Sequence, residues 1–442
     1  MKKWQGILLV SGAVTVCLAI VIGVIMAKSQ AKGYADRGLP VMNIELTGTE
    51  LDTIKTGNKE TKYGGNRMDL ISDNEVTEFT GVEIKGRGNA TWAQDKKPYQ
   101  IKFEEKVDLL GLGAGRKWVL LANYLDDTSL RNAVSFGVAE MIGMDFAPQG
   151  KFVELYVNGA YEGLYYLTRK TEIAKNSVNL KSPDGILVEL DNIYGKYEVY
   201  YQSGKGNCLV VKDVKEKGRE DELMGKFLTD FNKMEIAAEQ GDYATFSEVA
   251  DVESFAKYFL ISEFIVDVDA YLTSEYFYQD GGKIFAGPVW DYDMTFGNDK
   301  WRITFDPTVD LPLKNEVIGN EIYDPETGEI IPGMVYDTGS GEAVEWNQYY
   351  HVTKIFYQLM EMPEFRAQVE QQFREKLSGR EQEMLIMVRQ IVNTIREARH
   401  VDAEKWNKFD YEEETETLID WIRLRYRHME QMYGEGAKGS VI

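Results

Sequence analysis

The chain has 442 residues, and its 50 basic and 72 acidic side chains give a formal net charge of −22 at pH 7. This acidity argues against non-specific binding to nucleic acid or to an anionic membrane surface, because both require a basic protein surface. Two cysteines, Cys17 and Cys208, and three histidines exclude a disulfide framework and a zinc site built on cysteine. Any chemistry is therefore expected to depend on carboxylates, lysines and backbone groups.

The N-terminus carries an apolar run that is long enough to cross a membrane. Residues 7–27 contain no charged side chain, and a helix of this length spans the roughly 30 Å of a bilayer core. We expect a short tail at 1–6, a transmembrane anchor or uncleaved signal at 7–27 and a polar tether at 28–40. The short tail favours a single-pass protein with its large domain outside the cytoplasm. A cleaved signal is the alternative, because Ser29-Gln30-Ala31 resembles a cleavage site.

The next part of the chain is expected to form strands and one helix. In the segment 98–103, the apolar residues Tyr99, Ile101 and Phe103 alternate with polar residues, so the two kinds of side chain lie on opposite faces of a strand. The expected elements are strands at 41–46, 81–86, 98–103 and 118–121 and a helix at 129–142.

Two hairpins are expected from their turn residues. The strands 151–157 and 160–167 flank Asn158-Gly159, the dipeptide that a type I′ turn favours. A second hairpin is predicted at 276–279 and 283–285, around Asp280-Gly281-Gly282.

The remaining segments are mostly helical, with one long loop and a polar stretch before the first helices. Residues 182–220 are polar and rich in glycine, and residues 299–345 are expected to be a long loop that we interpret as an acceptor-binding element. Asp251 is a plausible N-cap for the second of two helices. Helices are expected at 222–238, from 251 to about 267, and from 347 to about 433. Hairpins early and helices late make the fold class α+β.

Two D-x-D pairs, Asp267 with Asp269 and Asp291 with Asp293, stand on either side of the second hairpin. A hairpin brings its two ends back together, so both pairs are expected to face one site. Carboxylates of this kind suit Mg²⁺ or Mn²⁺, which keep bound waters and bridge phosphate oxygens. The alternative is that each pair only marks a turn or the end of a strand.

Three further residues are candidates for holding a nucleotide. Lys102 lies on the polar face of its strand and can hold a phosphate as a point charge, unless it is a solvated lysine at a sheet edge. Arg87 stands between Gly86 and Gly88, where backbone amides can approach an anion, although a simple turn explains the segment too. Glu140 can orient a lysine by charge pairing, or it is an exposed glutamate late in its helix.

The longer motifs of the chain together resemble the spore coat protein H (CotH) kinase family, which are atypical secreted protein kinases. They occur in family order over roughly residues 41–375. The matching segments are Lys85-Gly86-Arg87-Gly88-Asn89-Ala90-Thr91-Trp92, Lys96-Lys97-Pro98-Tyr99-Gln100-Ile101-Lys102-Phe103, Lys117-Trp118-Val119-Leu120-Leu121-Ala122-Asn123-Tyr124, Leu130-Arg131-Asn132, Val153-Glu154-Leu155-Tyr156-Val157-Asn158-Gly159 with Gly163-Leu164-Tyr165, and Gly287-Pro288-Val289-Trp290-Asp291-Tyr292-Asp293.

The resemblance implies a divergent protein-kinase-like fold, with a sheet lobe and a helical lobe, over residues 41–375. Residues 376–442 are then a C-terminal helical extension packed on this domain. The resemblance further implies that Asp269 orients or deprotonates the acceptor hydroxyl. Lys102 is expected to bind the nucleotide phosphates, with Glu140 as its partner.

The metal ligands implied by the resemblance are Asp291 and a second residue. Asp291 matches the metal-binding aspartate of an ordinary kinase. Ser274, five positions after Asp269, stands where an ordinary kinase has a metal-binding asparagine, so Ser274 or Asp293 is expected to supply the further ligand. The chain also lacks a G-x-G-x-x-G loop, so its nucleotide is expected to be clamped differently.

The function expected from the resemblance is phosphoryl transfer from ATP, with Mg²⁺ or Mn²⁺, to Ser or Thr of surface or spore-coat proteins. The enzyme is expected to be membrane-anchored and extracytoplasmic, without a nucleic-acid partner and with its oligomeric state left open. One alternative is a non-catalytic surface or coat scaffold with the same fold. A D-x-D glycosyltransferase is the other, and it is disfavoured because the strands come as hairpins rather than as repeated βα units.

Overall fold

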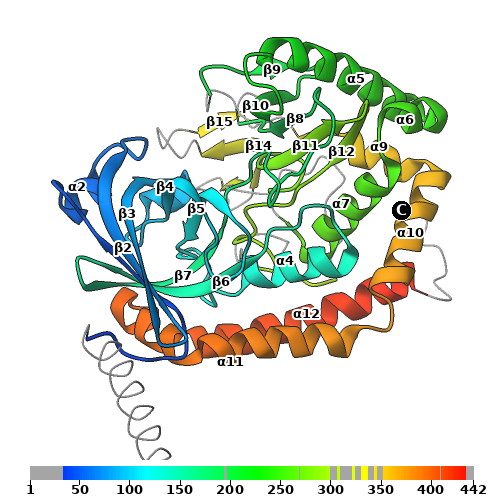
Figure 1. The fold of residues 1–442 in the computed structure, drawn as a ribbon. Helices are drawn as coiled ribbons and strands as arrows, with labels where there is room; N and C mark the ends of the chain where they lie inside the picture. Colours follow the sequence, from blue (N-terminus) through cyan, green and yellow to red (C-terminus); the bar gives the residue numbers. More distant parts are fainter. Residues whose placement is uncertain are drawn as a thin grey trace, which may run out of the picture. The chain divides into compact units, whose positions relative to one another are not determined.

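The computed structural model describes residues 33–193, 197–267, 269–298, 306–308, 321–323, 330–336, 343–345, 352–408 and 410–434. The chain divides into two compact units, each a mixture of strands and helices, and this confirms the α+β class (Figure 1). The first, which we call the barrel unit, comprises Met1–Tyr124, Gly150–Thr168 and Asn393–Lys408, and the second, the mixed unit, comprises Leu125–Gln149, Arg169–Val392 and Phe409–Ile442.

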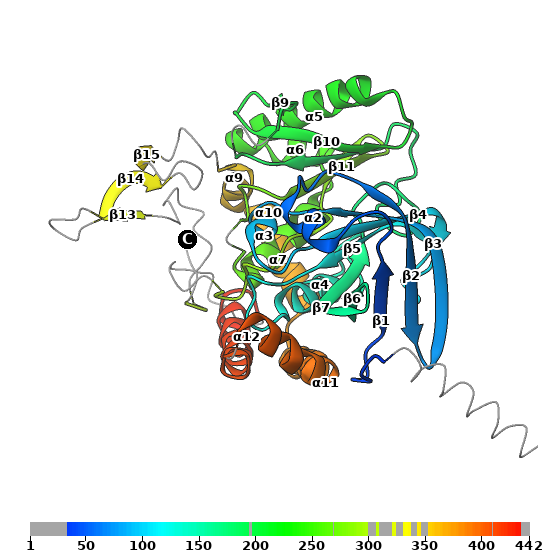
Figure 2. The ribbon, with the colours of Figure 1, turned by 90° about the vertical axis from the view of Figure 1, so that its left-hand side faces the viewer.

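The strands of the barrel unit form a closed barrel in the order β1-β2-β3-β4-β5-β7-β6. Neighbouring strands β1, β2 and β3 pair antiparallel, as Figure 2 shows for the blue part of the chain, whereas β1 and β6 pair in parallel. Closure leaves no unpaired sheet edge. The elements are β1 (Val41–Glu45), α2 (Leu51–Thr56), β2 (Tyr63–Ser72), β3 (Glu75–Gly86), α3 (Ala90–Ala93), β4 (Tyr99–Val107), β5 (Gly115–Leu121), β6 (Gly150–Val157) and β7 (Ala160–Arg169).

The interior of the barrel is filled by apolar side chains from alternate positions of the strands. Tyr99, Ile101 and Phe103 of β4 belong to this core, as their spacing predicts, while Gln100 and Lys102 between them are only partly buried. The barrel is therefore a packed core rather than a channel.

Helix α11 (Glu381–Trp406) contributes its second half to the barrel unit. There the buried ammonium group of Lys96 lies 2.7 Å from the Asp402 carboxylate and donates to the carbonyl oxygen of Leu164 at 2.6 Å. Gly163 gives room for this contact, because a Cβ at its position would lie 2.5 Å from Asp402 Oδ1. A paired and hydrogen-bonded buried charge thus fixes this part of α11 to β7.

The mixed unit is built on a sheet with the strand order β12-β11-β8-β10-β9. Phe277 of β11 packs against Phe231 of α5 and Phe255 of α7, with ring centroids 5.6 and 5.8 Å away, so both helices cover the same face of the sheet. The elements are α4 (Arg131–Ile142), β8 (Ile186–Leu190), β9 (Tyr201–Gln202), β10 (Cys208–Val214), α5 (Glu220–Gln240), α6 (Tyr243–Val249), α7 (Val252–Ile265), β11 (Glu275–Asp280), β12 (Lys283–Ala286), α9 (Ile355–Glu361), α10 (Pro363–Lys376) and α12 (Tyr411–Tyr433).

Both hairpins predicted from turn chemistry are present. Asn158 and Gly159 connect β6 to β7 with φ values of 51° and 77°, the positive values that a type I′ turn requires. Gly281 and Gly282 connect β11 to β12 and have φ values of 61° and 85°. The predicted helix at 129–142 is α4, which ends at Gly143 with φ 79°.

One stretch differs from the expectation of a loop, and a polar stretch for which no element was predicted also contains strands. The polar segment 182–220 contains β8 and β10, which pair antiparallel. In the stretch 299–345, expected to be a loop, β13 (Glu321–Tyr323), β14 (Ile330–Tyr336) and β15 (Ala343–Glu345) form a small antiparallel sheet. These strands are short, and polar and glycine residues surround them in the sequence. The alternating apolar pattern of each strand is therefore too brief to stand out.

The predicted membrane anchor belongs to the N-terminal segment of the chain. The transmembrane anchor predicted at 7–27 and the tail at 1–6 lie outside the described residues. Within the part of the chain that the structure describes, every helix is too short or too polar to span a membrane.

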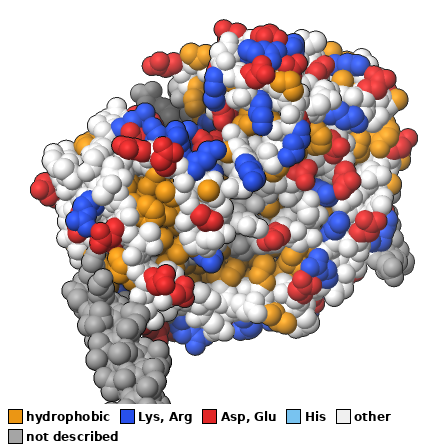
Figure 3. Space-filling model, viewed as in Figure 1, with side chains coloured by type: hydrophobic (Ala, Val, Ile, Leu, Met, Phe, Trp, Pro, Cys, Tyr) orange, Lys and Arg blue, Asp and Glu red, His pale blue; other side chains and the backbone are white. Residues whose placement is uncertain are grey.

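Charged side chains of both signs are interspersed over the face of the molecule in Figure 3. Ion pairs also occur among the exposed and half-buried charged residues. Arg219, for example, contacts Glu216, Glu222 and Asp184 at 2.7 to 2.9 Å. Both signs of charge are thus mixed on this face (Figure 3), which shows no single acidic patch.

Candidate active site

The first aspartate segment begins where α7 ends. Asp251 caps the start of α7 by accepting a hydrogen bond from the backbone N–H of Ser254, as predicted. At the other end Val266 has φ 47°, a left-handed conformation that strains a β-branched residue. The chain therefore leaves the helix abruptly just before Asp267, whose carboxylate is buried and accepts a hydrogen bond from the backbone N–H of Asp269 at 3.1 Å.

The loop after Asp269 is held by its own backbone and by the end of β8. The N–H groups of Leu272 and Thr273 both donate to the carbonyl oxygen of Asp269 at 3.1 Å. The Thr273 hydroxyl donates to Asp191 at 2.8 Å, and the Asn192 N–H donates to the carbonyl oxygen of Leu272 at 2.8 Å. These bonds to a central strand fix the path of the loop around Asp269.

The second aspartate segment follows β12 and returns to the end of α7. Asp291 and Phe296 have φ values of 69° and 50°, so the segment bends sharply at both residues. The N–H of Phe296 donates to the carbonyl oxygen of Ile265 in α7 at 2.7 Å. The Ser274 hydroxyl donates to Asp291 Oδ2 at 3.3 Å. The two D-x-D segments therefore meet at the end of α7.

The carboxylates of the two segments lie close enough to affect each other's ionisation. Burial is the main cause that raises the pKa of Asp267 well above its ordinary value, and repulsion from Asp269 and Asp291 adds to the effect. Burial likewise raises the pKa of Asp293, with further repulsion from Asp291 and Asp269. The pairs predicted to face one site are thus brought close enough for their carboxyl groups to interact electrostatically.

A further acid, Glu275, adjoins this region at the start of β11. Its side chain is fully buried and accepts a hydrogen bond from the N–H of Tyr271 at 2.8 Å. Burial raises the pKa of Glu275 to about 8. Glu275 is therefore mostly protonated at neutral pH.

The donor set of this region fits a hard divalent cation. Among the residues described, no group of three or more His, Cys, Asp or Glu is arranged to hold a metal ion by itself. Mg²⁺ usually takes one or two protein carboxylates and completes its shell with water and phosphate oxygens. Asp291 and Asp293, with Ser274 beside Asp291, meet that requirement, and a cation would relieve the repulsion among the buried carboxylates.

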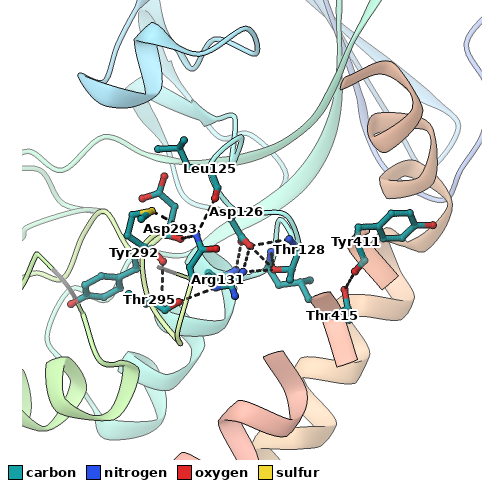
Figure 4. Close-up of polar contacts among 12 residues, drawn as sticks. Leu125, Asp126, Thr128, Arg131, Tyr292, Asp293, Thr295, Tyr411 and Thr415 are labelled. Carbon is teal, nitrogen blue, oxygen red and sulfur yellow. Dashed lines mark hydrogen bonds and ion pairs between the residues drawn. The ribbon is translucent and has the colours of Figure 1, made fainter. Parts of the chain in front are cut away.

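A buried arginine, Arg131, holds the backbone of the second aspartate segment (Figure 4). Arg131, in the first turn of α4, pairs with Asp126 at 2.5 Å and donates from Nε to the carbonyl oxygen of Thr295 at 2.9 Å. The neighbouring Asn132 accepts from the N–H of Tyr292 at 2.9 Å. Because Tyr292 and Thr295 bracket Asp293, these bonds set the course of the segment on which the aspartates lie.

Sequence reasoning assigned no role to this network. Its signal was present in the motif Leu130-Arg131-Asn132, which carried part of the family resemblance. The partners of that motif are far away in the sequence. Arg131 and Thr295 are 164 positions apart, and Asn132 and Tyr292 are 160 positions apart. Spacing along the sequence does not reveal a contact of that kind.

The predicted nucleotide-binding residues of the barrel unit lie on or beside its strands. Lys102 of β4 stands opposite Glu83 of β3 and Lys117 of β5 and is partly buried. Arg87 follows β3, and its N–H donates to the carbonyl oxygen of Pro98 at 3.3 Å. Glu140, the expected partner of Lys102, belongs to the mixed unit and is exposed near the end of α4. The pairing of Lys102 with Glu140 stays a prediction.

The loop around Arg87 depends on its glycines. Gly88 has φ +80°, and a Cβ there would lie 2.1 Å from the Thr91 hydroxyl oxygen. A Cβ at Gly86 would lie 2.4 Å from the ring of Trp92. Lys59 donates to the carbonyl oxygen of Gly88 at 2.6 Å. The loop is therefore a tight, basic turn with little room for any other residue at either glycine.

Comparison with known families gives one match. A family model described as CotH kinase protein matches residues 83–429. The match begins in β3 and ends in α12, so it includes Lys102, Arg131 and both aspartate segments. A search of curated proteins found no match.

Proposed function

The chain belongs to the CotH kinase protein family, and we propose that it transfers the γ-phosphoryl group of ATP to a Ser or Thr hydroxyl of a protein. The observation that carries this proposal is the meeting of the two D-x-D segments at the end of α7, where their carboxylates share one region. Family membership supports a divergent protein-kinase-like fold as the framework for this chemistry. Phosphoryl transfer asks little covalent chemistry of a protein and depends on positioning and charge neutralisation.

Each aspartate has a proposed role. Asp269 accepts the hydrogen bond of the acceptor hydroxyl and orients its oxygen toward the phosphorus atom. Asp291, with Asp293 or Ser274, would hold Mg²⁺ or Mn²⁺, which neutralises phosphate charge when bound. Glu275, mostly protonated at neutral pH, adds little negative charge to the region. Asp267 and Asp293 are buried, and a bound cation would favour the ionised form of both carboxyl groups.

In the barrel unit, Lys102 and Arg87 are the proposed phosphate-binding residues. Both are cationic and partly exposed, so both can contact an anion. Glu140 is proposed to orient Lys102. The proposal extends to location: the apolar segment 7–27 would anchor the chain in a membrane, with the enzyme acting on surface or spore-coat proteins outside the cytoplasm.

Binding of nucleotide and metal by the full chain tests this function. We expect ATP with Mg²⁺ or Mn²⁺ to raise the melting temperature of the wild-type protein, because a ligand of the native state stabilises it. Asp291→Asn should abolish the shift, and Asp269→Asn should keep it while abolishing transfer of labelled phosphate to a protein acceptor. Glu361→Gln, at an exposed position of α9, is the matched control and should behave as wild type.

Other outcomes would decide against phosphoryl transfer. Absence of any shift with ATP and metal would leave a non-catalytic surface scaffold as the better account of the fold. A larger shift with a UDP-sugar than with ATP would favour a glycosyltransferase, which also uses D-x-D carboxylates to hold a metal against a diphosphate.

A further inference from the structure

We propose that the last helix, α12, is a positioning element of the active site and acts through Trp421 and Arg425. These two side chains hold the two segments that carry the aspartates. The inference rests on the proposed function for its kinetic consequences, although its structural part can be tested without catalysis. It assigns a role in the chemistry to a helix that the sequence suggested was only an extension packed on the domain.

Arg425 closes the end of α7. Its side chain is fully buried, and Nη2 donates to the carbonyl oxygen of Glu263 at 2.6 Å and to the Glu263 carboxylate at 2.7 Å. Nη1 also donates to the carbonyl oxygen of Pro307 at 3.2 Å. The carbonyls in the last turn of a helix lack partners within the helix, and a cation there is favourable. Arg425 therefore fixes the turn from which the chain enters Asp267.

Trp421 lies one helical turn before Arg425 and so projects from the same face of α12. Its ring packs edge-to-face against Phe296, with ring centroids 5.7 Å apart. Phe296 is buried, and its N–H forms the hydrogen bond to the carbonyl oxygen of Ile265. Trp421 thus packs against Phe296, the residue whose hydrogen bond joins the second aspartate segment to the end of α7.

The position of α12 is set independently of the aspartate segments. The Tyr426 hydroxyl donates to the carbonyl oxygen of Leu377 at 2.7 Å and accepts from the N–H of Arg380 at 2.8 Å. Ser378 also contacts Glu430 at 2.5 Å. Because the turn between α10 and α11 anchors the helix, α12 can serve as a fixed support for both segments.

The two side chains should have different kinetic effects because they support different aspartates. Arg425→Met removes the hydrogen bonds that fix the approach to Asp269, and we expect kcat to fall about 10- to 100-fold with the KM for ATP changed by less than about threefold. Trp421→Leu loosens the segment of Asp291, and we expect about tenfold weaker binding of Mn²⁺ with a smaller change in kcat at saturating metal. A merely structural role would not divide the effects in this way.

Matched controls lie on the exposed side of the same helix. Arg427, whose side chain is 58% exposed, pairs with Glu381 at 3.3 Å, and Leu424 is 50% exposed. Arg427→Met and Leu424→Ala should leave kcat and Mn²⁺ binding within about twofold of wild type. If Arg425→Met fails to fold, Arg425→Lys, which keeps the charge but loses the fork of donors, should show an intermediate loss of kcat.

Hydrogen exchange of the full chain separates this inference from the proposed function. The N–H groups of Asp267 and Phe296 are hydrogen-bonded to the carbonyl oxygens of Ser262 and Ile265. Peptides from 262–267 and 292–298 should therefore exchange faster in Trp421→Leu and Arg425→Met than in the wild type. Peptides from α5 should keep their protection. If the wild type neither binds ATP with metal nor transfers phosphate, the proposed function fails and exchange alone decides whether α12 positions the segments. Unchanged exchange in both segments, or equal losses of kcat and metal binding in both variants, would overturn the inference.

Discussion

Glu275 shows how burial alone changes the chemistry of a single side chain. An unperturbed glutamate has a pKa of about 4.3, whereas burial raises the pKa of Glu275 to about 8 in the folded protein. Between these values the folded state holds a proton that the unfolded state releases. The free energy of unfolding therefore falls as pH rises through this window, by up to about 1.4 kcal/mol per pH unit.

Glu275→Gln tests this linkage. Glutamine resembles the protonated acid and keeps an oxygen that can accept from the N–H of Tyr271, so the fall in stability between about pH 5 and about pH 8 should be smaller in the variant. Urea unfolding at several pH values measures the difference. Glu361→Gln, at an exposed site, should keep the wild-type slope, and an equal slope for Glu275→Gln and wild type would contradict the assignment.

At the scale of elements, the barrel depends on a helix that comes from far along the sequence. The second half of α11 reaches β7 through Lys96 and Asp402, and Trp406 donates to the carbonyl oxygen of Glu162 at 3.2 Å. Burial lowers the pKa of Lys96, and the nearby Asp402 carboxylate opposes that shift. A buried ion pair of this kind is sensitive to geometry, because loss of one partner leaves the other charge uncompensated.

Gly163→Ala is expected to disrupt this contact. Gly163 and Gly159 have φ values of 132° and 77°, so alanine strains the backbone at both positions. The cost is about 1–2 kcal/mol at Gly159, and the φ of Gly163 lies outside the left-handed helical region altogether. A Cβ at Gly163 would also lie 2.5 Å from Asp402 Oδ1, whereas one at Gly159 meets nothing within 4 Å. Denaturant unfolding should therefore show a greater loss for Gly163→Ala than for Gly159→Ala, with faster proteolysis of residues 393–406. Equal losses would contradict the expected clash between a Cβ at Gly163 and Asp402.

At the scale of the whole molecule, the net charge of −22 destabilises the compact state through repulsion among like charges. Salt screens such repulsion, so NaCl should raise the melting temperature modestly from a low starting ionic strength. MgCl₂ at matched ionic strength should raise it further, because binding at Asp291 adds to screening. Asp291→Asn should remove that excess and leave the NaCl effect intact. An equal response to both salts in the wild type would argue against a metal site.

The features that the sequence alone determined are those with local causes. The hairpin turns follow from glycine and asparagine at positions of positive φ, and the start of α7 follows from the Asp251 side chain. The burial of Tyr99, Ile101 and Phe103 follows from their alternation in a strand. The two D-x-D pairs meet because a short hairpin separates them. For the turns, the helix cap and the strand, the information lies within a few residues, where sterics and capping decide the structure. For the D-x-D pairs it lies in the hairpin between them.

The features that only the tertiary structure decided are contacts between distant parts of the chain. Arg131 contacts Thr295, Lys96 contacts Asp402 and Arg425 contacts Glu263. The two residues of each pair are far apart in the sequence. From the sequence alone, a charged residue is predicted to be exposed to solvent. Its burial is costly unless a partner of opposite charge and hydrogen bonds are available. Folding supplies those partners only when helices and strands pack together. That is why the sequence predicted the aspartates of the candidate site and did not predict the buried arginines that hold them.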